Sequence, residues 1–157
     1  MKAIFVREFA AINKSFGETF EELFGGGRAE LLLEDENDVL GCGIEIRVRP
    51  PGKTLKTISL LSGGERAFVA IALYFAIMKV RPTPFCVLDE IEAALDEKNV
   101  DRFAQYLRRM SEKTQFLVIT HRRGTMEEAD VLYGVTMQHG VSKLLSIDLS
   151  EVDLKEA

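Results

Sequence analysis

The stretch Leu60-Leu61-Ser62-Gly63-Gly64-Glu65-Arg66 decides the fold of this chain. It lies between a turn rich in proline and glycine (50–54) and a long apolar run (67–80). A serine and two glycines at a helix start leave backbone N–H groups uncovered at the positive end of the helix dipole, so the pattern predicts a phosphate site. Taken alone, it is explained more simply as a serine-capped helix start with a glycine hinge. The residues downstream favour the phosphate site.

An apolar run followed by two acids comes next, at Phe85-Cys86-Val87-Leu88-Asp89-Glu90. The run predicts a strand buried on both faces, as in a parallel sheet. Because ligands bind at the carboxyl edge of such sheets, Asp89 and Glu90 are expected at the functional edge. Asp89 suits a Mg²⁺ site, often through water, and Glu90 could polarise an attacking water. Two acids that cap the next helix are the alternative for this pair alone.

Two more motifs follow, and the order of all four is informative. They are Ala93-Ala94-Leu95-Asp96 and, after the apolar run 116–119, Thr120-His121. Together the four resemble the ATP-binding cassette (ABC) ATPases. LSGGE is similar to their signature motif, the run ending in Asp89 and Glu90 to Walker B, residues 94–96 to the D-loop, and His121 to the switch histidine.

The sequence around these motifs resembles one branch of these ATPases, the bacterial SMC proteins of chromosome condensation. Transporter cassettes usually carry a proline after the Walker B glutamate, whereas Ile91 follows here. Residues 120–127 read THRRGTME, and residues 23–27 and 49–53 fit the same family. The resemblance covers nearly the whole chain. It implies an α/β fold, the C-terminal lobe of an ABC-type ATPase head, with a mostly parallel sheet flanked by helices.

The resemblance also implies roles for the site residues, with ATP and Mg²⁺ as cofactors. Asp89 on the metal, Glu90 on the attacking water and His121 on the γ-phosphate would complete the ATP site of their own head. Asp96 would line the interface between two heads. The signature motif would face the γ-phosphate held by the second head through Ser62, Gly63, Gly64 and Glu65.

The chain has no phosphate-cradling P-loop of its own. Gly52-Lys53-Thr54 mimics the end of one, but the glycine required five positions earlier is replaced by Arg47, so these residues are interpreted as a turn. In the family the P-loop belongs to the N-terminal half of the head. The chain is therefore interpreted as the C-terminal half, inactive alone in ATP hydrolysis, with apolar surface and sheet edges left open.

The first 24 residues form a separate unit in this interpretation. Apolar residues three and four positions apart predict one helix over residues 4–23. By resemblance, residues 1–24 are the end of a coiled-coil arm entering the head, and residues 25–157 are the lobe itself. A helix that packs on its own domain remains the alternative.

The other expected elements alternate between strands and helices. Strands are predicted at 29–33, 43–48 and 114–119, and a closing hairpin is predicted from 131–137 and 143–147. Helices are predicted at 63–80, over the one-faced apolar pattern of 100–110, and at 125–129. His139, beside the turn glycine, is expected to be exposed, and the polar tail 150–157 to be frayed.

Composition limits the class of protein. With 157 residues the chain is one domain in size, and 46% hydrophobic with 29% charged residues is ordinary for a soluble globular protein. No apolar run reaches the roughly 20 residues of a membrane span. Cys42 and Cys86 lack metal-type spacing, which favours reduced structural thiols. The net charge of −5 argues against a surface that is basic throughout, so DNA contact would need a local patch.

Partners follow from the resemblance. They are the N-terminal half of the same head, a second SMC head in a homodimer, a kleisin subunit, and DNA through the full complex, at the nucleoid in the cytoplasm and without a membrane. Two interpretations stay open beside this one. The chain could be a kleisin-docking module with no activity alone, or a fragment of another ABC-type ATPase, either a Rad50/RecN-like repair protein or a transporter subunit.

Overall fold

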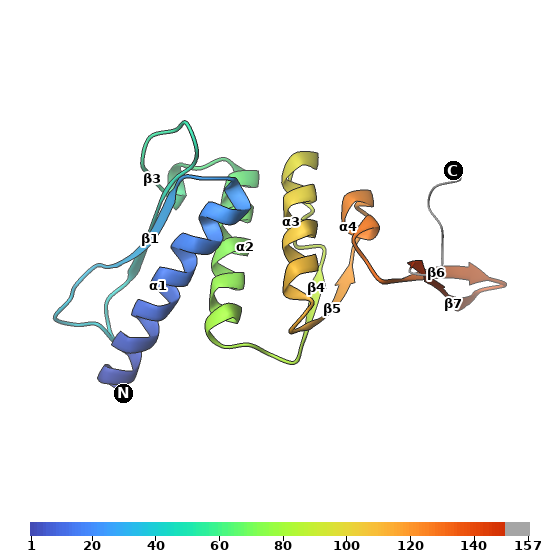
Figure 1. Ribbon diagram of the computed structural model, residues 1–157, viewed down its shortest axis with the longest axis horizontal. Coiled ribbons are helices and arrows are strands. Elements are labelled where there is room, and N and C mark those ends of the chain that lie inside the picture. Colours follow the sequence, from blue (N-terminus) through green and yellow to red (C-terminus); the bar gives the residue numbers. More distant parts are fainter. Residues whose placement is uncertain (150–157) are drawn as a thin grey trace.

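The computed structural model describes residues 1–149 as two lobes of helices and strands followed by a projecting hairpin (Figure 1). The predicted frayed tail, 150–157, lies outside the described residues. Helix α1 (Lys2–Phe24) and helix α2 (Gly63–Val80) pack side by side. The C-terminal part of α1 enters the core, where the rings of Phe20 and Phe24 stack with centroids 4.0 Å apart. At its N-terminal part, Ile4 and Val6 are exposed.

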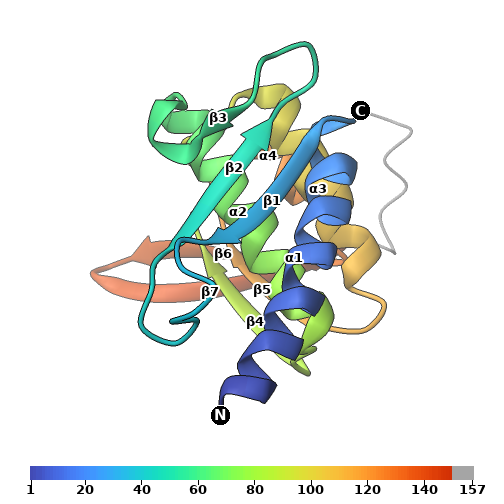
Figure 2. The same cartoon turned by 90° about the vertical axis from the view of Figure 1, so that its left-hand side faces the viewer.

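An antiparallel sheet lies beside α1. It consists of β1 (Arg28–Leu33), β2 (Ile44–Arg49) and the short β3 (Lys56–Thr57), which leads through the 3-10 turn η1 (Ile58–Leu60) into α2 (Figure 2). Asn13 of α1 holds the sheet, because its side chain donates to the carbonyl of Leu31 at 2.9 Å and accepts from the N–H of Leu31 at 2.7 Å.

The second lobe is a parallel strand pair with its helices. Strands β4 (Phe85–Asp89) and β5 (Gln115–Ile119) run parallel, joined by α3 (Glu97–Met110), and α4 (Arg123–Glu127) follows β5. Aromatic packing joins this lobe to α2, since the ring of Phe75 lies 5.1 Å from that of Tyr106 and 6.0 Å from that of Phe103. The predicted helices and strands are thus present, with bounds shifted by at most three residues and those of 63–80 unchanged.

The expectation of a mostly parallel sheet is wrong for this chain. Within residues 1–149 the strands form three separate sheets, and β4–β5 is the parallel pair among them. Strand β4 is also not buried on both faces. Cys86 and Leu88 are buried against the core, whereas Phe85 is 64% and Val87 52% exposed. The physical reason is that two strands with helices on one side leave their other face uncovered.

Strands β6 (Val131–Gln138) and β7 (Val141–Asp148) form the predicted closing hairpin, which projects away from the second lobe (Figure 1). His139 and Gly140 make the turn with φ angles of 52° and 76°, and His139 is exposed as expected. Nearly every residue of the hairpin is exposed, including Val135 and Met137. None of the helices within residues 1–149 is long and apolar enough to cross a membrane.

Candidate functional site

The signature turn caps helix α2 in the way the sequence predicts. The N–H of Glu65 donates to Oγ of Ser62 at 3.3 Å, and the N–H of Ser62 donates to Oε2 of Glu65 at 3.1 Å. This reciprocal capping box satisfies two backbone donors of the first turn. Further N–H groups of that turn remain free of helical partners at the positive end of the dipole. The turn is exposed at Ser62 and Gly63, so an anion can reach it.

Lys53 adds a positive charge to this turn. Residues 50–53 form the predicted turn, with the N–H of Lys53 donating to the carbonyl of Pro50 at 3.1 Å. The turn places Nζ of Lys53 2.5 Å from Oε1 of Glu65. This hydrogen bond, followed by those from Ser62, lowers the pKa of Glu65 to about 2. The sequence indicates only a turn at 52–54, and no local pattern reveals this contact, which brings together residues twelve positions apart.

The acidic strand end lies at the carboxyl edge of the parallel pair. Asp89 ends β4 opposite Ile119, and the N–H of Glu90 donates to the carbonyl of Ile119 at 2.9 Å. Glu90 has a left-handed backbone with φ of 48°, a conformation that costs energy in a residue other than glycine and is concentrated at functional sites. Nδ1 of His121 lies 3.4 Å from Oε1 of Glu90, and both side chains are more than half exposed. The structure therefore brings Asp89, Glu90 and His121 together.

Asp96 caps helix α3. Its Oδ1 accepts from the backbone N–H of Asn99 at 2.9 Å, and its Oδ2 accepts from the side chain of Asn99 at 3.0 Å. The helix cap is therefore Asp96, and neither Asp89 nor Glu90 caps the next helix, which was the alternative for that pair. The side chain stays exposed, so capping leaves it accessible to a partner.

The signature turn and the D-loop touch within the same chain. A Cβ built on Gly64 would lie 2.9 Å from the carbonyl oxygen of Ala94, closer than real Cβ contacts come. The N-terminal ends of α2 and α3 and the carboxyl ends of β4 and β5 accordingly face the same end of the molecule (Figure 1). All eight predicted site residues therefore belong to one end of the fold.

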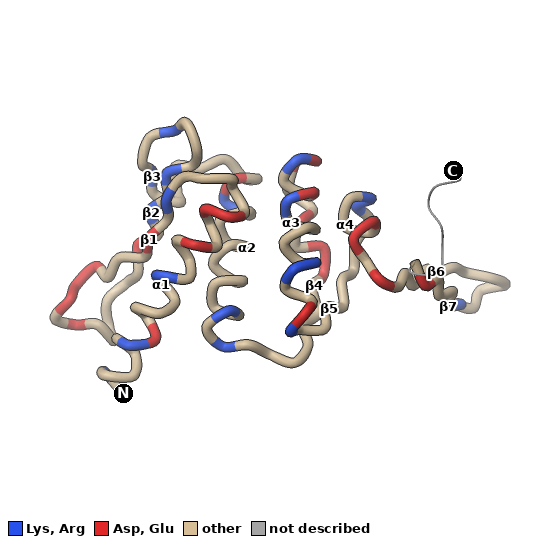
Figure 3. The backbone as a smooth tube through the Cα atoms, viewed as in Figure 1, with Lys and Arg blue, Asp and Glu red and all other residues tan. Residues whose placement is uncertain are grey.

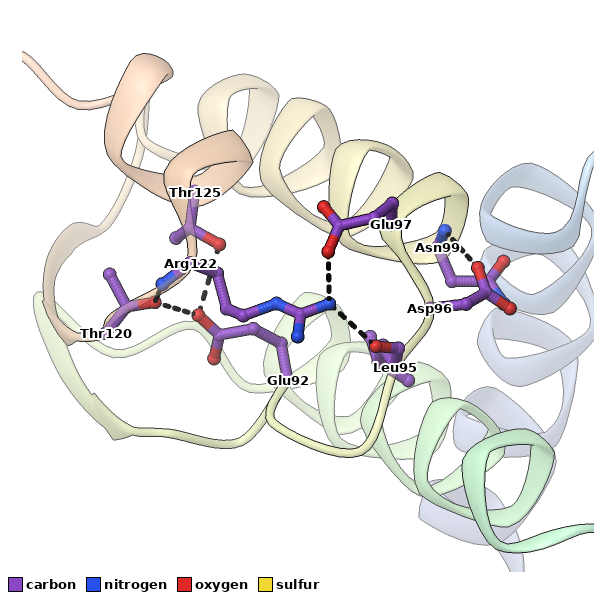
Figure 4. A network of polar contacts seen from close by, with 8 residues as sticks. All are labelled: Glu92, Leu95, Asp96, Glu97, Asn99, Thr120, Arg122 and Thr125. Carbon is purple, nitrogen blue, oxygen red and sulfur yellow. Dashed lines mark hydrogen bonds and ion pairs between the residues drawn. The ribbon is translucent and has the colours of Figure 1, made fainter.

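A buried polar network joins the two loops that carry the site (Figure 4). Oε1 of Glu92, which is 0% exposed, accepts from the hydroxyls of Thr120 at 2.5 Å and Thr125 at 3.1 Å. Nη2 of Arg122 donates to the carbonyl of Leu95 at 2.9 Å. Sequence reasoning missed Glu92 and Arg122 as functional candidates, because each looks like an ordinary loop charge and about thirty positions separate them.

Metal chemistry at this edge rests on Asp89 and Glu90. Within residues 1–149, no group of three or more His, Cys, Asp and Glu side chains is placed to hold a metal ion. Two exposed carboxylates still fit Mg²⁺, which usually binds through one or two carboxylates together with water and substrate phosphates. Asp89 therefore remains the candidate Mg²⁺ ligand at this edge.

Charge is spread over both lobes, and the hairpin carries little of it. Lysines and arginines are interspersed with acids on α1 and α3, whereas α2 carries few charges and β6–β7 is almost free of them (Figure 3). No single basic face stands out in this view, in keeping with the net charge of −5. The exposed apolar hairpin is the more distinctive surface.

Comparison with known proteins places these features in a family. A model of the family described as "RecF/RecN/SMC N terminal domain" matches residues 11–143. The chain is 67% identical over 144 residues to the chromosome partition protein Smc of Bacillus subtilis (strain 168), which covers 91% of this chain and 12% of that protein. The chain thus spans about an eighth of the length of such relatives.

Two solved structures are similar over nearly all of this chain. One, from work on ATP-driven dimerization and DNA-stimulated activation of SMC ATPases, is 45% identical with a TM-score of 0.87 and covers 96% of this chain and 91% of its own. The other, an Smc head bound to the C-terminal winged-helix domain of ScpA, is 46% identical with a TM-score of 0.87 and covers 94% of this chain and 45% of its own. The chain belongs to the RecF/RecN/SMC family, and its fold is that of an SMC ATPase head.

Proposed function

We propose that this chain is the C-terminal lobe of an SMC ATPase head that engages a second head through ATP, in chromosome condensation and segregation. One observation carries the proposal. The signature turn, the acidic strand end, the D-loop and His121 lie at one end of the fold, and Gly64 contacts the backbone at Ala94. Their convergence at the carboxyl edge of the parallel pair, where ligands bind in α/β folds, supports a shared nucleotide site.

The placement in the second half of the head rests on motif content. The matching family model is named for an N-terminal domain. A lobe that held the nucleotide by itself would need a P-loop, and the one candidate in this sequence, 52–54, is a turn with Arg47 in place of the required glycine. The missing loop must then come from another segment. Sequencing the complete gene product tests this, since we expect a P-loop far upstream of residue 1 and none downstream.

The uncovered face of β4–β5 supports the same placement. Four large apolar side chains stand exposed on it: Phe85, Val87, Leu117 and Ile119 are 64%, 52%, 56% and 51% exposed. Exposed apolar surface of this kind marks an interface. A parallel pair is normally part of a sheet covered on both faces, so a further lobe, the N-terminal half of the head, fits this face.

Electrostatics explain why engagement would need ATP. The triphosphate brings several negative charges, and the start of helix α2 with the hydroxyl of Ser62 offers donors to them. Such donors act strongly only where docking excludes water. Asp89 would hold Mg²⁺, Glu90 would orient the attacking water, and His121 would contact the γ-phosphate. Loss of that phosphate removes the link, so the two heads separate.

The hairpin β6–β7 favours a second role, the docking of a kleisin subunit. Its exposed apolar side chains include Tyr133, Val135 and Leu144, at 60%, 74% and 65% exposure. A related Smc head has been solved bound to the C-terminal winged-helix domain of ScpA. Binding of the isolated chain to such a domain, lost in Val135→Asp, supports docking, and it needs no P-loop. DNA would be engaged through the complete complex.

A complementation assay tests the ATPase proposal. The complete protein is prepared as Glu90→Gln and separately as Ser62→Arg, each expected to lose ATP hydrolysis by about 10²- to 10⁴-fold, as for a general base or an oriented donor. If Ser62 serves the nucleotide of the partner head, mixing the two restores one intact site per heterodimer.

The matched control mixes Glu90→Gln with the double variant Glu90→Gln/Ser62→Arg, which leaves no intact site and should stay inactive. Activity restored only in the first mixture supports action across the interface. No recovery in either mixture, with heterodimers demonstrated by cross-linking, would refute it.

A further inference from the structure

Glu92 lies fully buried between the two loops that carry the candidate site. It is two positions after Glu90 and four before Asp96. Its Oε1 accepts two hydroxyl hydrogen bonds, from Thr120 at 2.5 Å and from Thr125 at 3.1 Å, both on the segment around His121. The side chain of Glu92 thus accepts hydrogen bonds from residues on both sides of His121.

Arg122 makes the reverse connection. Its Nη2 donates to the carbonyl of Leu95 at 2.9 Å and lies 3.1 Å from Oε1 of Glu97. These two residues flank Asp96. The N–H of Arg122 also donates to Oγ1 of Thr120 at 3.0 Å, and this hydrogen bond spans His121. Glu92, Thr120, Arg122 and Thr125 form what we call the crossed latch (Figure 4).

Stability alone explains the latch poorly. Oε2 of Glu92 and Nε of Arg122 are buried without a hydrogen-bond partner among the described residues. A buried charge that is only partly hydrogen-bonded costs free energy, and an apolar pair of similar volume often serves a fold as well or better. We therefore infer that Glu92 and Arg122 serve to fix the positions of the two loops that they connect.

We propose that Glu92 and Arg122 are positioning residues that lock the D-loop to the switch-histidine loop. Docking of Asp96 against a second head then sets the placement of Glu90 and His121. This inference rests on the proposed function. Arg122 holds the residues on either side of Asp96, and the latch pins the residues on either side of His121, so neither loop can shift alone.

The experiment uses the complete protein and compares Arg122→Ala with Arg123→Ala. Arg123 is its neighbour, and its side chain is 92% exposed and paired only with Glu127 among the described residues. Arg122→Ala should lower kcat about tenfold and leave KM for ATP within about twofold, because it disturbs alignment and not nucleotide binding. Arg123→Ala should leave both unchanged. Arg122→Lys, which can still reach the Leu95 carbonyl, should recover part of kcat.

A double-variant cycle separates positioning from general damage. If Arg122 acts through Asp96, adding Arg122→Ala to Asp96→Ala should lower kcat no further, whereas independent effects would multiply. Thr125→Val keeps the side-chain shape and removes one donor to Glu92, so it should lower kcat about threefold and decides the matter if Arg122→Ala does not fold.

Equal kcat in the Arg122 and Arg123 variants would overturn the inference, as would multiplying effects in the cycle. Glu90→Gln, measured in the same assay, shows which idea has failed. If Glu90→Gln hydrolyses ATP at the normal rate, the proposed function is wrong. If it is inactive while Arg122→Ala is normal, only the latch is wrong.

Discussion

Gly64 lies directly against the carbonyl oxygen of Ala94, which a Cβ on Gly64 would meet at 2.9 Å. The glycine thus lets the signature turn and the D-loop come into backbone contact. A glycine at this place is required by the close approach and not by its dihedral angles, since Gly64 does not have a positive φ. The contact ties the surface expected to face a partner's nucleotide to the loop expected at the dimer interface.

Gly64→Ala should destabilise the chain, whereas Gly63→Ala should not. A Cβ on Gly63 meets nothing within 4 Å, so alanine there gains helix propensity and should be neutral or stabilising by up to about 1 kcal/mol. Alanine at 64 must displace the D-loop backbone, at about 1–3 kcal/mol. Urea denaturation of both variants checks this, and equal midpoints would show that the D-loop yields freely.

The uncovered face of β4–β5 should make the isolated chain self-associate. Val87 and Leu117 are 52% and 56% exposed and lie opposite each other in the parallel register. Val87→Ser with Leu117→Ser removes apolar area from that face, so light scattering should show a shift toward monomer.

Val6→Ser is the control for this shift, because Val6 is also exposed but lies on α1, away from the strand pair. It should leave the oligomeric state unchanged. If self-association persists in the Val87→Ser/Leu117→Ser variant and is lost in Val6→Ser, the self-association surface lies on α1 and not on β4–β5.

Sequence patterns predicted the motif positions well and the layers less well. Ser62 caps α2 and Asp89 ends β4 as expected, because capping and strand ends are encoded by neighbouring residues. The apolar run at 85–88 suggested burial on both faces, and Val87 is exposed. An apolar run does not say which element covers each face, and within residues 1–149 only one face of β4 is covered.

The crossed latch could not be read from the sequence for a different reason. Glu92 and Arg122 each lie in a loop, and no periodic pattern marks Glu92 as buried or Arg122 as its neighbour. Only the parallel pairing of β4 with β5 brings their two loops to the same edge. Contacts that depend on tertiary register carry no periodic signal.

Asn13→Ala should destabilise the junction between α1 and the antiparallel sheet. The side chain satisfies both backbone groups of Leu31, with hydrogen bonds of 2.9 and 2.7 Å. Their loss should cost about 1–3 kcal/mol, the usual range for unsatisfied groups. Asn99→Ala, which removes one side-chain bond to Asp96 on an exposed helix end, should cost less. Equal losses in urea denaturation would contradict the assigned role.

Acid should weaken the signature turn through Glu65. Lys53 and Ser62 lower the pKa of Glu65 from 4.5 to about 2, so the folded state binds this proton less readily than the unfolded chain does. The stability that Glu65 contributes is therefore complete above pH 4.5 and is lost as the pH falls through about 2. Lys53→Ala removes the hydrogen bond that lowers this pKa most, so the pKa of Glu65 should rise toward 4.5 in that variant.

The measurement is the free energy of unfolding at about pH 6 and about pH 2.5 for the wild type, Lys53→Ala and the exposed control Lys113→Ala. At the higher pH Lys53→Ala should be less stable than the wild type by about 1 kcal/mol or less, since the ion pair is partly exposed. That gap should narrow at the lower pH, because Glu65 of the unfolded chain is protonated there and this proton uptake stabilises the unfolded state against the folded one. A gap that stays constant would mean that Lys53 supports the turn through packing rather than charge.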